Sequence, residues 1–110
     1  MELPAMITRL PEAVLTYPAT AVKTNVLQSA HGQLVFMQFL EAVDLPEHSH
    51  KGQWGTVLEG RVELTIGGVT RTHGPGNPYY IPAGVPHSAK VPAGATVIEF
   101  FEEPDRFRLK

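Results

Sequence analysis

Two histidines separated by a single residue lie near the middle of the chain. The segment 48–53 is His-Ser-His-Lys-Gly-Gln, so the amide of Gln53 follows His50 by three residues. Alternate side chains of an extended chain point to the same side, which places His48 and His50 on one face. Imidazole is the commonest protein ligand for transition metals. The segment therefore fits a divalent metal site, although two exposed histidines at a strand end would have the same spacing.

The other histidines differ in their sequence context. His87 follows Val85 and Pro86, a pair typical of a rigid turn, and is available as a third metal ligand. His31 and His73 each precede a glycine in turn-like sequence. We expect both of them to lie in loops and to face solvent.

A carboxylate lies inside an apolar segment close to the C-terminus. Glu99 is flanked by two apolar residues on each side, and burying a lone carboxylate is costly. It is either an exposed residue of an edge strand or, if it faces the interior, a catalytic residue: a general base or a partner of a metal-bound histidine. Beyond it, Glu102, Asp105 and Arg106 either border the same site or belong to a polar tail. A solvated tail is the expected meaning of the basic cluster of Arg106, Arg108 and Lys110.

Three large aromatic residues lie beside these candidates. Trp54 follows Gln53 and points to the opposite face in a regular strand, so we expect it in the core or in a subunit interface. Tyr79 and Tyr80 also point to opposite faces. One of them could line a pocket, but core packing is the expected role of either.

The segments that must position these residues are short, because ten glycines and ten prolines interrupt the chain. Only residues 11–14 suit a helical turn. Runs rich in β-branched and aromatic residues predict strands at 21–27, 33–40, 54–58, 62–66, 79–81, 87–91 and 96–101. Short strands separated by frequent turns are typical of an antiparallel sandwich or a small barrel. We therefore predict a single all-β domain.

The composition limits the classes of protein to which the chain can belong. Apolar residues make up 43% and charged residues 18%, which is ordinary for a globular protein. The net charge of −2 gives no attraction to nucleic acid or to an anionic membrane, and no apolar run is long enough to cross one. The absence of cysteine excludes disulfides and thiolate ligands. The first residues do not resemble a signal peptide, so we expect a cytoplasmic protein.

Two segments together resemble the two signature motifs of the cupin superfamily. The first, at about 44–60, contains His48, His50 and Gln53 and ends at Gly60. The second, at about 76–91, begins at Gly76 and has Pro-Ala-Gly at 82–84 before its histidine. The resemblance implies an antiparallel double-stranded β-helix, or jelly-roll barrel, over residues 1–110. Residues 1–15 would then be an arm that leads into the barrel.

The cupin motifs normally supply three histidines and a glutamate to one metal ion. By position, His48, His50 and His87 match the three histidines, and Gln53 stands where the glutamate is usual. The segment between His50 and Gln53 is slightly shorter than usual, and Val91 replaces the asparagine that usually ends the second motif. The resemblance implies one divalent metal, which could be Zn, Ni, Fe, Mn or Co. Without the carboxylate the ion would keep its full charge, favour anionic ligands and be held more weakly.

The resemblance leaves two classes of function open. Cupins include dioxygenases, sugar isomerases, decarboxylases and small proteins that open unsaturated uronate sugars, and the last group resembles this chain in size and in its glutamine. We therefore expect a metal-dependent enzyme of the isomerase, lyase or oxygenase type that acts on a small, oxygen-rich, anionic molecule, such as a sugar acid or an enolisable carboxylate. The alternative is a non-catalytic module that binds or senses a small ligand.

Small cupins are usually dimers, so we also expect a homodimer. Residues 16–27 and the aromatic residues of the outer sheet are the expected interface.

Overall fold

Strands form where β-branched and aromatic residues lie between the glycine- and proline-containing turns. The computed structural model describes residues 1–16 and 20–110. The described residues form the short helix α1 (Ala5–Thr8) and nine strands: β1 (Val22–Ser29), β2 (Gly32–Phe39), β3 (Val43–His48), β4 (Gln53–Glu59), β5 (Val62–Ile66), β6 (Val69–His73), β7 (Tyr79–Ile81), β8 (His87–Val91) and β9 (Thr96–Phe101).

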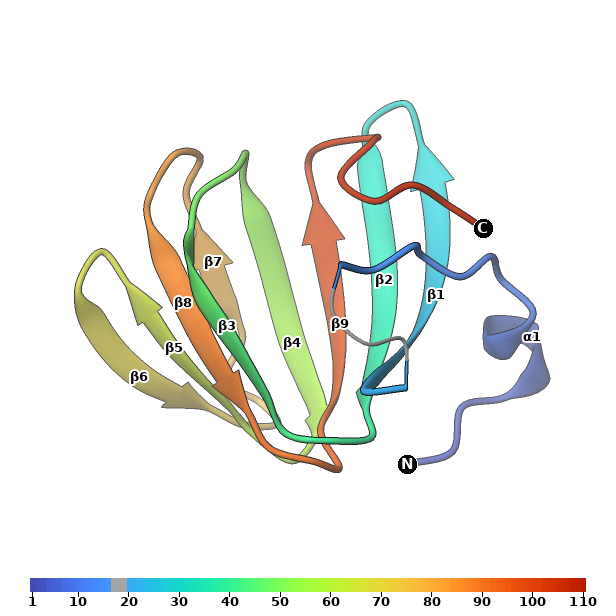
Figure 1. Cartoon of the computed structure of the whole chain (residues 1–110), viewed down its shortest axis with the longest axis horizontal. Helices are drawn as coiled ribbons and strands as arrows, with labels where there is room; N and C mark the ends of the chain where they lie inside the picture. The colour runs from blue at the N-terminus through green and yellow to red at the C-terminus, as the bar shows by residue number, and fades with distance from the viewer. Residues whose placement is uncertain (17–19) are drawn as a thin grey trace.

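The strands form two antiparallel sheets that face each other (Figure 1). One sheet has the order β1-β2-β9-β4-β7 and the other has the order β3-β8-β5-β6. Neighbouring strands in space are therefore often distant in sequence, as in a jelly roll. The arrangement confirms the predicted all-β, antiparallel fold.

The predicted strands agree with the structure except at two places. Strands β3 and β6 were not predicted. β3 alternates only over its first four residues and contains Pro46 and two acidic residues, and β6 exposes every residue but His73, so neither shows the full alternation typical of a half-buried strand. The predicted helical turn at 11–14 is wrong, because Ala13 forms a β-bridge with Leu109 and the helix lies earlier, after Pro4. No helix in the described part of the chain is long and apolar enough to cross a membrane.

The core lies between the two sheets, on their inner faces. Val26, Val35, Val57 and Val97 point inward from four strands of the larger sheet and are almost fully buried. On each strand, the residues directly before and after these valines point to the outer face. This alternation fixes which side chains of β4, β7 and β9 face the interior.

The outer face of the larger sheet carries one row of large side chains across all five of its strands. The cross-strand pairings join Leu27 to Leu34, Leu34 to Phe100, Phe100 to Trp54 and Trp54 to Tyr80. Leu27, Trp54 and Tyr80 are exposed. Trp54 therefore points away from Gln53, as predicted, whereas core packing is the wrong expectation for Tyr80.

Both terminal segments are attached to the larger sheet near β1 and β2. The side chain of Asn25 donates hydrogen bonds to the carbonyl oxygens of Thr8 and Leu10, at 3.2 and 2.9 Å. At the other end of the chain, fully buried Gln33 bonds both the backbone amide and the carbonyl of Phe107, each at 2.9 Å. The C-terminal segment is thereby held against β2, where Figure 1 shows it crossing the sheet.

Candidate metal centre

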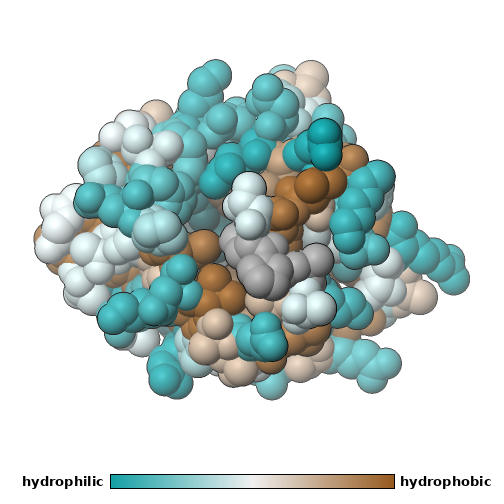
Figure 2. Space-filling model, in the orientation of Figure 1, coloured by the Kyte–Doolittle hydropathy of each residue, from teal (hydrophilic) through white to brown (hydrophobic). Residues whose placement is uncertain are grey.

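A cavity of about 520 Å³ lies between the two sheets. Side chains of β2, β3, β4, β5, β7, β8 and β9 line it, together with Val14, Thr16 and residues 106–108. Most of the residues that line it are apolar, and Figure 2 shows apolar residues on this face with hydrophilic residues toward its periphery. The polar groups of the cavity wall therefore decide what the cavity can hold.

An irregularity in β3 brings two of the candidate histidines together. Leu45 pairs with Ala89 on β8, whereas His48 pairs with His87, so β3 has one extra residue between these two pairs. A bulge of this kind re-aims the side chains that follow it. It places His48 opposite His87, at the end of β3 where the chain turns toward His50.

The three imidazoles converge on one point. Their ring centroids are 5.3 Å apart for His48 and His50, 4.3 Å for His48 and His87, and 4.7 Å for His50 and His87. Each residue offers a ring nitrogen such that all three nitrogens lie within 4.8 Å of one another, a spacing that could hold a metal ion. The sequence-based expectation that these three histidines meet is confirmed.

Backbone carbonyls fix the orientation of each imidazole. The Nδ1 atoms of His48, His50 and His87 lie 2.8, 2.7 and 3.0 Å from the carbonyl oxygens of Pro46, Lys51 and Val85. A carbonyl oxygen can only accept, so each neutral ring carries its proton on Nδ1 and has a lone pair on Nε2. This is the arrangement that orients histidine ligands in metal sites.

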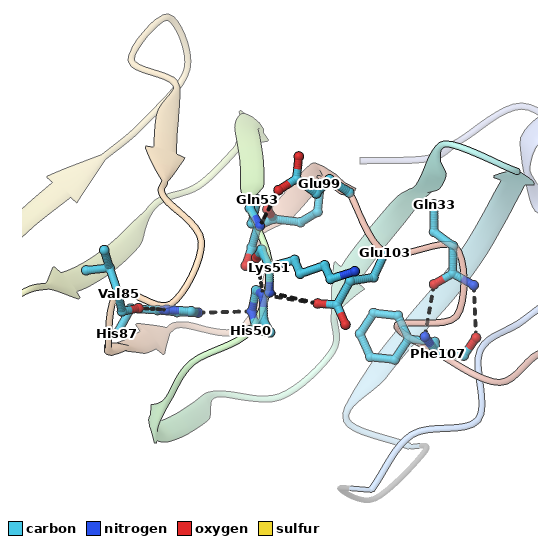
Figure 3. A network of polar contacts seen from close by, with 11 residues as sticks. Gln33, His50, Lys51, Gln53, Val85, His87, Glu99, Glu103 and Phe107 are labelled. Atoms are coloured by element: carbon cyan, nitrogen blue, oxygen red, sulfur yellow. Dashed lines mark hydrogen bonds and ion pairs between the residues drawn. The ribbon is translucent and has the colours of Figure 1, made fainter.

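The electrostatics of the site favour neutral imidazoles. The Nε2 atoms of His50 and His87 lie 3.1 Å apart (Figure 3), a contact between two acceptors that a shared cation would stabilise. Burial lowers the pKa of both His50 and His87 below the ordinary value of 6.5, and the positive charge of Arg106 acts in the same direction. Metal binding requires deprotonated rings, so the lowered pKa keeps these ligands available at neutral pH.

Gln53 lies at the edge of the same cavity, at the beginning of β4. Its Nε2 donates a 2.7 Å hydrogen bond to Oε2 of Glu99. Because the carboxylate requires a donor, the amide nitrogen faces Glu99, and the amide oxygen points toward the imidazoles in Figure 3. The amide oxygen is therefore the atom of Gln53 that remains free for another partner.

A glycine allows Glu99 and Tyr79 to meet across an intervening strand. Gly55 on β4 pairs with Glu99 on β9 and with Tyr79 on β7, so the three residues form one row on the inner face. A β-carbon at Gly55 would collide with the ring of Tyr79 and with the carboxylate of Glu99. Without it, the hydroxyl of Tyr79 donates a hydrogen bond to Oε1 of Glu99.

The burial of Glu99 corrects the expectation of an exposed edge position. β9 lies between β2 and β4, and the side chain of Glu99 is only 6% exposed. Burial raises the pKa of this carboxyl from 4.5 to about 7, against the opposing effect of its hydrogen bonds from Gln53 and Tyr79. Burial and the neighbouring Glu99 also raise the pKa of the Tyr79 hydroxyl well above 10, so Tyr79 remains a donor.

Some of the remaining candidate residues are exposed at the surface, and others are buried or line the cavity. His31 is exposed, as predicted. His73 is buried at the end of β6, where its Nδ1 lies 3.1 Å from the carbonyl oxygen of Asn77 and its ring contacts Tyr79 edge-on, so the expectation of a solvent-facing loop is wrong. Arg108 and Lys110 are exposed, but Arg106 is half-buried and lines the cavity. Of the alternatives left open by the sequence, Arg106 borders the cavity instead of belonging to a solvated tail, and Tyr79 is the tyrosine that lines it.

Comparisons with known proteins agree with this geometry. The family model described as "Cupin domain" matches residues 35–101, which include both motif segments. No curated protein sequence matches the chain.

Solved structures with the same fold are distant in sequence. KdgF from a Halomonas species is 20% identical with a TM-score of 0.69, over 86% of this chain and 88% of that one. An RmlC-like cupin from Shewanella frigidimarina is 22% identical with a TM-score of 0.70, over 88% of each chain. Bacillus subtilis oxalate decarboxylase, described with Mn(II) centres, is 22% identical with a TM-score of 0.66, over 78% of this chain and 26% of that one.

Proposed function

Because this chain belongs to the cupin family, we propose that it binds one divalent metal ion and uses it as a Lewis acid on a small, oxygen-rich, anionic substrate. The proposed chemistry is of the isomerase, lyase or oxygenase type. The proposed ligands are His48, His50, His87 and the amide oxygen of Gln53.

The observation that carries the proposal is the common orientation of the three imidazoles. Each donates Nδ1–H to a backbone carbonyl, which leaves its Nε2 unprotonated, and one ring nitrogen of each lies within 4.8 Å of those of the other two. Exposed histidines would not need three separate carbonyls to hold them. The cavity beside them leaves space for a substrate, as in a catalytic metal site and unlike a closed structural one.

Glu99 changes the expected charge of the site. A glutamine among the ligands would leave the divalent charge uncompensated, but a buried carboxyl lies one amide away, bonded to Gln53. Ionisation of Glu99 would supply part of the negative charge that the usual glutamate provides, from outside the ligand shell. The metal would then be less electropositive than the sequence alone indicates.

The chain's own groups suit proton transfer beside a polarised substrate. The metal would polarise a carbonyl or carboxylate oxygen, or activate water or dioxygen. Glu99 has a pKa of about 7 and lines the cavity, so it can take up or release a proton near neutral pH. The hydroxyl of Tyr79 holds one carboxyl oxygen in place.

We expect elemental analysis of the purified protein to find about one divalent metal per chain, and His48→Ala to lose most of it. His31→Ala is the matched control, since it removes an exposed imidazole from the surface. Depletion of sugar acids and enolisable carboxylates should depend on the metal and on His48. Depletion that survives His48→Ala would exclude the metal mechanism, and ligand binding without depletion would identify a binding module instead of an enzyme.

We also propose that the chain forms a homodimer through the outer face of the larger sheet. The row of Leu27, Leu34, Phe100, Trp54 and Tyr80 supports this face, because its apolar side chains run across all five strands. Part of the segment 16–27 that the sequence suggested as an interface, residues 17–19, lies outside the described residues.

Trp54→Glu is expected to shift the protein toward monomer at micromolar concentration, because a charge would have to be buried within the row, between Phe100 and Tyr80. Light scattering coupled to size-exclusion chromatography measures the mass. Val69→Glu is the control, since it places the same charge at an exposed apolar position on the other sheet. A wild-type monomer, or equal masses for all three proteins, would contradict this interface.

A further inference from the structure

Arg106 enters the cavity from the C-terminal segment. Its guanidinium carbon lies 4.8 Å from the ring centroid of Phe107 and 5.5 Å from that of Phe101. The two rings are nearly perpendicular, with centroids 5.3 Å apart, and the guanidinium packs against both of them. A cation stacked on aromatic faces keeps its N–H groups free at its edge.

The aromatic support of Arg106 is itself fixed. Gln33 is fully buried, and its amide bonds both backbone groups of Phe107, as Figure 3 shows. Gln28 accepts a further 2.8 Å hydrogen bond from the same Gln33 amide. The backbone next to Arg106 is therefore fixed before any ligand arrives, which lowers the entropic cost of binding.

Arg106 has no acidic partner among the described residues. Its Nε is buried without a hydrogen bond, and none of the ion pairs between described residues includes it. The neighbouring acids are engaged elsewhere: Glu102 accepts from the amide of Gly52, and Glu103 accepts from the amide of Lys51, each at 3.0 Å. The charge of the guanidinium is therefore unpaired among the described residues, so a ligand carboxylate that pairs with it gains affinity.

The guanidinium of Arg106 and the imidazole of His50 both contact the ring of Phe101. Phe101, which supports Arg106 on one side, has its centroid 5.7 Å from that of His50. The charge of Arg106 lowers the pKa of both His50 and His87, which places it within electrostatic reach of the site. A molecule of a few carbon atoms could therefore contact both groups at once.

We propose that Arg106 binds the carboxylate of the substrate while another oxygen of the same molecule faces the imidazole cluster. The planar fork of a guanidinium matches the two oxygens of a carboxylate, and a charge-assisted pair in a half-buried position is stronger than a neutral hydrogen bond. The inference rests on the proposed function and narrows it to substrates with a carboxylate beside an oxygen-bearing carbon. Arg106 is then the residue that selects acids over their uncharged analogues.

The test compares each acid with an uncharged analogue of similar shape: D-glucuronate with D-glucose, lactate with lactamide, and pyruvate with pyruvamide. Calorimetry gives the dissociation constants. The ¹⁵N–¹H signal of the Arg106 Nε, assigned by its loss in Arg106→Lys, reports contact with the ligand directly. We expect at least one acid to bind more tightly than its analogue and to shift this signal. Arg106→Gln should raise the dissociation constant of that acid by about 10- to 100-fold and leave the dissociation constant of the analogue unchanged.

Two control variants separate the specific contact from charge alone. Arg61→Gln removes the same charge from an exposed position that does not line the cavity, and it should leave the acid's affinity within about twofold. Arg108→Gln should have a much smaller effect than Arg106→Gln, because Arg108 is exposed at the edge of the cavity. Equal binding of acids and analogues, or equal loss in all three variants, would overturn the proposal.

Measurements on metal-loaded and on chelator-treated protein separate this inference from the proposed function. An effect of Arg106→Gln that persists without metal supports the carboxylate site by itself. If elemental analysis finds no metal and Arg106→Gln still weakens binding of the acid, the proposed function is overturned but the carboxylate site is supported. If the protein binds stoichiometric metal but Arg106→Gln leaves the affinity for the acid unchanged, the carboxylate site is overturned and the proposed function stands.

Discussion

Glu99→Gln is expected to make the metal-free protein more stable than the wild type at pH 8, and to lose that advantage as the pH falls toward 4.5. Glu99 is buried, and its pKa is raised from 4.5 to about 7 in the folded protein. Between these two values the folded chain binds more protons than the unfolded chain. The free energy of unfolding therefore falls as the pH rises through this range.

The size of the effect follows from the shift in pKa. A shift of this size corresponds to about 3 kcal/mol of stability that is present below pH 4.5 and lost above pH 7. Glutamine has nearly the same shape, cannot ionise, and still accepts from Tyr79. The variant should therefore escape the cost of a buried charge at high pH.

Urea unfolding of chelator-treated protein at several pH values measures the two profiles. The relevant quantity is the difference between variant and wild type, because His50 and His87 have lowered pKa values and act in the opposite direction in both proteins. Glu63→Gln, at an exposed position on β5, is the control and should give a difference near zero throughout. A constant offset between Glu99→Gln and wild type across the range would contradict a raised pKa at Glu99.

The position of Glu99 also shows what the sequence could not provide. The spacing of His48 and His50 carries information about the site because both lie in one short segment, and the turn before His87 is equally local. Glu99 depends on which strands flank β9, and its neighbours β2 and β4 are distant from it in sequence. Its apolar flanks fit both an edge strand and a buried central strand, so the pattern alone could not choose.

The same reasoning applies to Gly55, which the sequence analysis did not assign to the site, and to Arg106, which it left open as a site or tail residue. In the sequence, nothing distinguishes Gly55 from any other glycine in a strand. Only the strand register shows that it lies between Glu99 and Tyr79. In the sequence, Arg106 has the surroundings of a tail residue. In the structure, Gln33, which is distant in sequence, fixes the backbone of the neighbouring Phe107. Contacts between strands that are not consecutive assemble both the polar wall and the histidine cluster, but the histidines, unlike Glu99, Gly55 and Arg106, also have a recognisable local spacing.

Gln53→Glu is expected to destabilise the metal-free protein and to bind metal more tightly than the wild type. The new carboxylate would lie against Glu99, in place of an amide that now donates a 2.7 Å hydrogen bond to it. Two carboxylates at this distance cannot both ionise without cost, so the pair would share one proton and the variant should lose a few kcal/mol above pH 7. A cation at the imidazole cluster would relieve this repulsion.

The same substitution places a formal negative charge at the proposed ligand position. One unit charge next to a divalent ion is worth several kcal/mol even at the effective dielectric of a protein site. We therefore expect the metal affinity to rise by at least about tenfold. Competition with a chelator of known affinity measures the dissociation constant, and denaturation with and without metal should show a larger metal-induced stabilisation than in the wild type.

The double variant Gln53→Glu with Glu99→Gln exchanges the two side chains and completes a double-mutant cycle. It keeps one carboxyl and one amide in contact, so the metal-free protein should recover most of the stability that Gln53→Glu loses. The carboxylate is then a ligand instead of a neighbour of a ligand, and tight metal binding should remain. A metal affinity that Gln53→Glu leaves unchanged would show that this position lies outside the ligand set, leaving a centre of three histidines with Glu99 and Gln53 as its polar wall.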